Sequence, residues 1–157
     1  MGFDKTSDKL NKGEDMGLDQ HAHIKGVKID WEKFFNDDEY SDNAGVFVWR
    51  KHARLQEFMA RKWAEQNPVE KIDGHLAHLG FNSDQEAPCY ITEDVVKELA
   101  EQIEKGFSDY HAEDGFFWGQ QFQKESVKEY KEQDIKFLKF CEQAINDKKV
   151  VEYWCSW

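Results

Sequence analysis

The chain has 157 residues, of which 15% are aromatic, and its formal net charge is −11. This surplus of carboxylates disfavours direct DNA binding, because binding to phosphates depends on clustered Lys and Arg. The length is enough for one domain that folds without a disulfide or a metal. No apolar run approaches the roughly 18 residues that a membrane-spanning helix needs.

The three cysteines, Cys89, Cys141 and Cys155, contain no CxxC pair and lack the spacing of a metal site. An odd number of thiols favours free cysteines in a reducing compartment. The first fifteen residues are polar and charged, which is not typical of a signal peptide. We therefore expect a cytoplasmic protein without a metal or another cofactor.

Residues 1–15 have no apolar periodicity, so we expect a flexible polar arm that precedes a single domain over residues 16–157. Alternating apolar and polar residues in 18–29 predict a strand that is interrupted at Gly26. Residues 36–45 have the composition of a turn or loop.

Apolar residues at helical spacing predict a helix that begins near Gly45 and ends before Pro68. Residues 69–90 contain two glycines and a proline, and we expect them to be irregular. Thr92 is a good N-cap for a second helix, and Gly106 is placed to end that helix in the left-handed conformation.

A third, longer helix is predicted from about Lys124 to Asn146, with a stripe of apolar residues that includes Cys141. The β-branched and aromatic segment 150–157 then predicts a final strand. These elements favour an α+β domain, in which a small antiparallel sheet packs against about three helices.

Trp49, Arg50 and Lys51 would lie at the start of the first predicted helix. A helix N-terminus attracts anions, and Arg can bind a phosphate or carboxylate with two hydrogen bonds. This segment is therefore our candidate anion-binding site. Alternatively, the arginines of the helix form ion pairs with the acidic segment 84–104, and each such surface pair stabilises by only about 0–1 kcal/mol.

Two aromatic motifs are the other candidates. The aromatic residues of 115–119, Trp118 among them, could line a pocket and stack on a planar ligand, or they could fill the core. In the final strand, Trp157 alternates onto one face with Tyr153, while Trp154 lies on the other face. A Trp on the second face would be core or would contact a partner or ligand.

The histidines and cysteines give weaker signals. His21 and His23 would share a strand face, and His75 and His78 a helix face, but nothing in the sequence brings the two pairs together. We therefore expect no metal site. Cys141 is expected in the core, which leaves Cys155 as the better candidate for a reactive thiol.

Four segments together resemble one protein family. They are Met16-Gly17-Leu18-Asp19, Val46-Phe47-Val48-Trp49-Arg50-Lys51, Gly115-Phe116-Phe117-Trp118-Gly119 and Tyr153-Trp154-Cys155-Ser156-Trp157. The sequence is similar over residues 16–157 to a family of small tailed-phage proteins of unestablished function, some of which carry the label phosphoglycerate kinase. Trp118 and Cys155 depart from the family's Phe and Ser. The chain contains no GxxxxGK[ST] or GxGxxG loop that would hold a nucleotide phosphate.

The resemblance implies a phage accessory protein in the host cytoplasm. With no complete catalytic motif, we expect non-enzymatic binding of a host protein or a small anionic ligand, and we assign no catalytic residue. The expected binding residues are Trp49, Arg50, Lys51, Trp118, Trp154 and Trp157. The alternatives are a small enzyme acting on a phosphorylated metabolite, and an acidic nucleic-acid mimic that blocks a basic host protein through residues 68–123.

Overall fold

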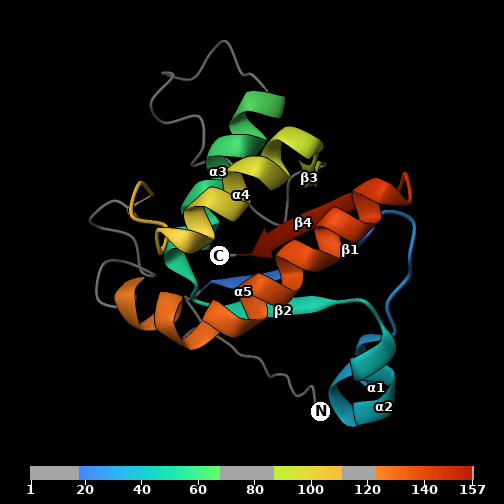
Figure 1. Ribbon diagram of the computed structural model, residues 1–157. Helices are drawn as coiled ribbons and strands as arrows, with labels where there is room; N and C mark the ends of the chain where they lie inside the picture. The colour runs from blue at the N-terminus through green and yellow to red at the C-terminus, as the bar shows by residue number, and fades with distance from the viewer. Residues whose placement is uncertain (1–17, 68–86, 111–122, 157) are drawn as a thin grey trace.

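A four-stranded antiparallel sheet forms the centre of the domain (Figure 1). The computed structural model describes residues 18–67, 87–110 and 123–156. The strands are β1 (Asp19–Ile24), β2 (Phe47–Arg50), β3 (Cys89–Ile91) and β4 (Val151–Ser156), in the order β2-β1-β4-β3. The first and last strands of the described chain therefore pair at the middle of the sheet, and β2 and β3 are its edges.

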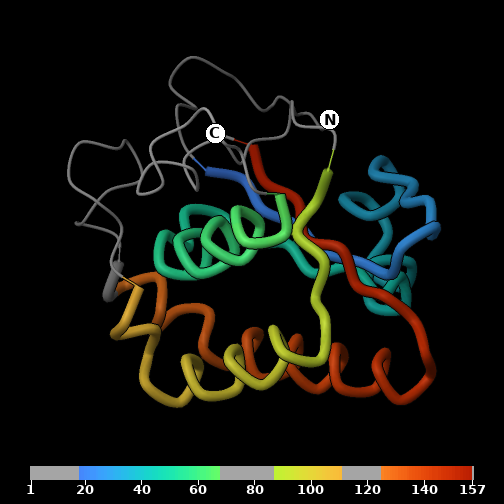
Figure 2. The backbone as a smooth tube through the Cα atoms, turned by 90° about the horizontal axis from the view of Figure 1, so that it is seen from above, coloured from blue at the N-terminus to red at the C-terminus, as the bar shows by residue number. Residues whose placement is uncertain are grey.

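Five helices accompany the sheet in the described part of the chain. They are α1 (Trp31–Asn36), α2 (Asp38–Asn43), α3 (Ala53–Gln66), α4 (Glu93–Glu104) and α5 (Gln123–Asn146). The three longer helices, α3, α4 and α5, lie on one side of the sheet, as the view from above shows (Figure 2). The predicted α+β class, with a small antiparallel sheet packed on helices, is confirmed.

Alternation along the strands gives the sheet two different faces. The inner face meets α3, α4 and α5, and its side chains are buried with few exceptions: Gln20, Ala22, Phe47, Trp49, Cys89, Ile91, Val151, Tyr153 and Cys155. The outer face points away from these helices, and its side chains are partly or largely exposed: Asp19, His21, His23, Val48, Arg50, Tyr90, Glu152, Trp154 and Ser156.

Both ends of α4 form as the sequence predicts. The Thr92 hydroxyl accepts a hydrogen bond from the Val95 amide, which caps the first turn. At the other end, Gly106 adopts a φ of +66°. The amide of the next residue, Phe107, then donates a hydrogen bond to the carbonyl of Gln102. The predicted long helix (α5) and the final strand (β4) are likewise confirmed.

The predicted helix start at Gly45 is wrong, because residues 47–50 form β2 and α3 begins only at Ala53. Two bulky rings, Phe47 and Trp49, alternate with residues that face the other way, and this pattern belongs to a strand. Lys51 then takes a φ of 60°, in the left-handed region, and turns the chain from the strand into the helix.

Three other sequence predictions are corrected. The first strand ends at Ile24 in a turn at residues 25–26, so it does not continue to Ile29. Residues 36–45 are not a plain loop, because α2 occupies most of them. The aspartates that begin α1 and α2 act as N-caps: the side chains of Asp30 and Asp37 accept from the amides of residues 33 and 40. The sequence also missed β3, whose first two residues end the segment 69–90 that was expected to be irregular.

Candidate functional site

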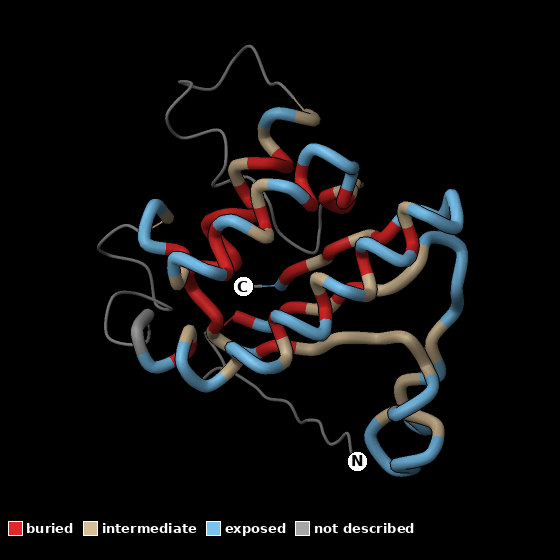
Figure 3. The backbone as a smooth tube through the Cα atoms, in the orientation of Figure 1, coloured by how far each residue is buried: buried red, intermediate tan, exposed pale blue. Residues whose placement is uncertain are grey.

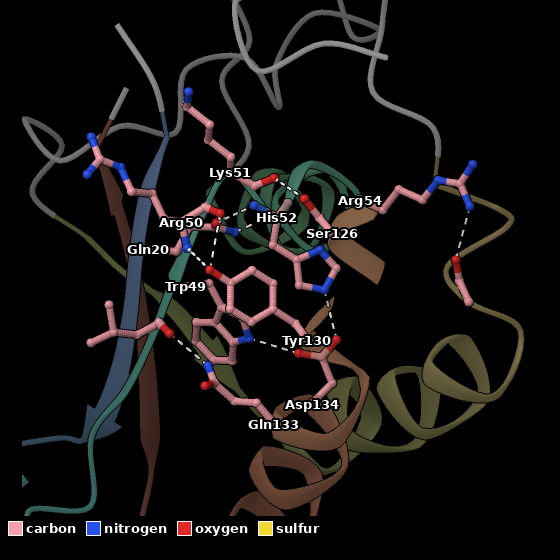
Figure 4. A network of polar contacts seen from close by, with 12 residues as sticks. Gln20, Trp49, Arg50, Lys51, His52, Arg54, Ser126, Tyr130, Gln133 and Asp134 are labelled. Atoms are coloured by element: carbon pink, nitrogen blue, oxygen red, sulfur yellow. Dashed lines mark hydrogen bonds and ion pairs between the residues drawn. The ribbon is translucent and has the colours of Figure 1, made fainter. Parts of the chain in front are cut away.

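The three residues of the predicted anion site point in different directions (Figure 4). Trp49 is fully buried on the inner face, and its ring meets Phe137 edge-on at 4.9 Å. Arg50 lies on the outer face, where its Nε is 3.3 Å from a carboxylate oxygen of Asp19. Lys51 is partly buried at the turn into α3. These side chains therefore do not converge on one ligand.

Trp49 instead belongs to a buried polar network. Asp134 on α5 is 2% exposed, and its two oxygens accept from Trp49 Nε1 and His52 Nε2, both at 2.8 Å. Because a carboxylate oxygen accepts, the proton of a neutral His52 ring lies on Nε2. One carboxylate thus joins β2, the residue before α3, and α5.

A second branch of the network continues across the sheet. The Gln20 side chain bonds both the amide and the carbonyl of His52, at 3.0 and 3.1 Å, and it donates to the Tyr153 hydroxyl at 2.7 Å. Tyr153 donates in turn to Gln56, whose amide lies 3.3 Å from the Cys155 sulfur. Burial raises the pKa of the Tyr153 phenol well above its usual range.

His52 and Asp134 have the pairing of an acid–base dyad, but their surroundings make them structural. The His52 ring is fully buried between Tyr130, which stacks on it, and Phe107. Its Nδ1 has no hydrogen-bond partner among the described residues. The nearby hydroxyl of Ser126 donates to the carbonyl of Lys51 at 2.6 Å, so it is not activated by the ring. The dyad holds elements together and lacks an aligned nucleophile in the described chain.

Side chains from the helices also bond both edge strands of the sheet. On α5, the Gln133 amide donates to the carbonyl of Val48, and the Tyr130 hydroxyl bonds the amide and carbonyl of Arg50. On the opposite edge, the Gln66 side chain bonds the amide and carbonyl of Tyr90. Exposed edges are the usual places for another strand to add, and here side chains occupy these groups.

The outer face carries an aromatic row that crosses several elements. Trp154 on β4 stands opposite His21 on β1, and the His21 ring meets the indole of Trp31 at 5.0 Å. His21 also stacks on His23, with ring centroids 5.6 Å apart. Burial, and then the charge of His23, lowers the pKa of His21 to about 4. Trp154 remains partly exposed, and its Nε1 makes a long 3.3 Å contact with Glu152.

Two of the predicted binding residues therefore share the outer face. Arg50 and Trp154 lie on β2 and β4 with β1 between them, which places their strands about 10 Å apart. Trp118 and Trp157, with the whole 115–119 motif and the pair His75 and His78, lie outside the described residues.

The cysteines and histidines do not form a reactive or metal centre in the part of the chain that the structure describes. Cys141 is buried as predicted, but so is Cys155, and burial raises the pKa of the Cys155 thiol to about 12. Cys155 is thus a poor nucleophile, although the sequence had made it the better candidate for a reactive thiol. Within residues 18–67, 87–110 and 123–156, no group of three metal-binding side chains gathers.

The sequence did not single out Gln20, His52 or Asp134 as a network, although a signal was present. Gln20 occupies an inward position of the alternating strand, between Leu18 and Ala22. Asp134 lies four residues after Tyr130, on the apolar stripe of α5. A polar residue at a position that the pattern assigns to the core needs a partner, and two such positions predict a buried hydrogen bond.

No family model matches the chain, and neither the curated proteins nor the solved structures contain a match. Over the described residues, the structure contains no helix with the length and apolar character needed to cross a bilayer.

Proposed function

We propose that this chain is a non-enzymatic accessory protein of a tailed phage, which binds a host protein in the host cytoplasm through the outer face of its sheet. The aromatic row on that face carries the proposal: Trp154 and His21 are partly exposed on the outer face, and the partly exposed Trp31 packs against His21. The phage origin rests on the four sequence segments that resemble the phage family.

The composition of the outer face favours a protein partner. Trp, Tyr and Arg are the residues that most often dominate binding energy in protein interfaces, and Trp154, Tyr90 and Arg50 all lie on this face. Side chains from α3 and α5 already bond the edge strands, so the partner would dock on the face instead of extending the sheet.

The other hypotheses have less support. A small anionic ligand would need Arg50 and Lys51 to converge, whereas Arg50 lies beside Asp19 and Lys51 lies at the turn. An enzyme would use the His52–Asp134 pair, but both side chains are at most 3% exposed. Much of the acidic segment 68–123 lies outside the described residues, so a nucleic-acid mimic remains a hypothesis on sequence alone.

The test compares Trp154→Ala with Ile135→Ala, which removes an exposed apolar side chain from α5 instead. Partners are first captured from infected-host extract with the wild-type chain and then purified for titration. Because a central Trp contributes about 2 kcal/mol or more at such interfaces, we expect Trp154→Ala to raise Kd about 30-fold or more. Ile135→Ala should leave Kd unchanged. Equal affinity of both variants for every purified partner would rule out the outer face.

A further inference from the structure

An acidic pair of short helices continues the outer face. We call residues 30–43, which comprise α1, α2 and the N-cap of α1, the acidic hairpin. It carries six carboxylates against one lysine, a net charge of −5. The hairpin projects beyond β2 at one side of the domain (Figure 1), and its charged residues are all exposed (Figure 3).

Most of these carboxylates make no ion pair within the described structure. Asp30 and Asp37 cap the two helices. The other four make no ion pair with any described residue: Glu32, Asp38, Glu39 and Asp42. Some carboxylates elsewhere do pair, as Glu98 does with Lys62 at 2.6 Å. Unpaired like charges repel one another, so the hairpin keeps a local surplus that a cationic partner would neutralise.

The hairpin also adds exposed aromatic surface next to these charges. Trp31, which meets His21 of the sheet, packs in turn against Phe34 and Phe35. Phe35 is 54% exposed, the highest value among the large apolar side chains of the described residues. Apolar contact area thus runs from Trp154 through His21 to Phe35, and carboxylates border it.

We infer that the partner is a protein whose contact segment combines Lys and Arg with apolar residues, and that the acidic hairpin binds its basic side chains. This inference rests on the proposed function of the outer face. Complementary charge speeds association and rejects acidic competitors, while the buried aromatic contacts set the lifetime of the complex. The hairpin therefore favours positively charged partners, and the aromatic row slows their dissociation.

The test uses a displayed library of random dodecapeptides, selected for binding to the wild-type chain. Selected peptides are titrated against a hairpin variant, Glu32→Gln/Asp38→Asn/Glu39→Gln/Asp42→Asn. A matched control removes four exposed carboxylates from α5 instead, as Glu125→Gln/Glu129→Gln/Glu132→Gln/Glu142→Gln. Both variants change the net charge by +4, so a difference between them reports position and not total charge.

We expect the selected peptides to combine net positive charge with apolar residues. The hairpin variant should bind them about tenfold more weakly at low salt, a difference that shrinks near roughly 0.5 M salt, where exposed charges are screened. The control should bind like the wild-type chain. Peptides without basic bias, or equal losses in both variants, would overturn the inference.

Trp154→Ala separates this inference from the proposed function. If it weakens binding while the selected peptides are neutral or acidic, the outer face binds and the inferred basic partner is wrong. If it leaves the affinity of every selected peptide unchanged, both proposals fail together.

Discussion

The two faces of the sheet differ in how completely the chain uses their polar groups. On the inner face, Trp49 and Tyr153 are fully buried, and their polar atoms bond Asp134, Gln20 and Gln56. On the outer face, Trp154 stays partly exposed, and its indole makes a long 3.3 Å hydrogen bond to Glu152. Adjacent residues of one strand thus differ: the inner set packs and bonds within the fold, and the outer set leaves side chains partly exposed.

The largest effect should come from Asp134→Ala, which tests the inner network. It leaves the N–H groups of Trp49 and His52 buried without partners, and each such group costs about 1–3 kcal/mol. We expect the free energy of unfolding to fall by about 3–5 kcal/mol, since a broken buried pair has this cost. Urea denaturation measures the change, with Glu132→Ala on the same helix as the exposed control. A loss below about 1 kcal/mol would mean that the network does not hold the fold.

Tyr153→Phe and Trp154→Phe compare the two faces at adjacent positions. Loss of the Tyr153 hydroxyl leaves Gln20 and Gln56 without a shared partner, so we expect a destabilisation of about 1–3 kcal/mol. Trp154→Phe removes only a long, partly exposed hydrogen bond, and surface changes of this kind stay within about 0.5 kcal/mol. Thermal unfolding followed by circular dichroism measures both variants. Equal losses of stability in the two variants would show that the two faces do not differ in this way.

His21 should make the outer face sensitive to acid. Its pKa is lowered from 6.5 to about 4 in the folded chain, so the unfolded chain binds a proton at higher pH. Stability is therefore complete above pH 6.5 and declines as the pH falls towards 4, by up to about 3 kcal/mol, because each unit of pKa shift is worth about 1.4 kcal/mol. His21→Gln should flatten this part of the stability profile. The pKa can be measured directly by NMR titration, and a value near 6.5 would contradict the burial of His21.

The smallest effect is expected in thiol labelling, which measures the exposure of the cysteines and leaves the stability of the native protein unchanged. Cys89, Cys141 and Cys155 are buried with raised pKa values, so Ellman's reagent should modify them only as the chain unfolds. A Ser156→Cys variant adds a thiol on the exposed face, one residue from Cys155. It should add one rapidly reacting equivalent to the native protein. Rapid labelling of the wild-type chain would show that the inner face is accessible.

Much of the fold follows from local pattern. The caps of α4 at Thr92 and Gly106, the long α5 and the alternation of β4 were all predictable, because each depends on neighbouring residues. The β2 strand was misassigned because Val48 and Leu55 also match a helical period, and only pairing with β1 decides between the two. Local pattern cannot supply such long-range pairing.

The candidate site was less predictable for a similar reason. The sequence identified Trp49 and Trp154 as unusual, and strand alternation assigned Trp154 to the minority face. Whether a Trp faces helices or solvent depends on which face the helices cover, and that is a property of the whole sheet. The partnership of His52 with Asp134 joins residues 82 positions apart, a distance that no local pattern spans.

The pairing of β1 with β4 has a consequence for how the chain reaches its native state. Residues 19–24 and 151–156 are hydrogen-bonded at the centre of the sheet, so this contact closes a loop that contains nearly the whole described chain. The entropy of closing such a loop must be overcome before the pairing stabilises anything. The helices should therefore form on a faster timescale than the sheet, and β-sheet assembly should limit the folding rate.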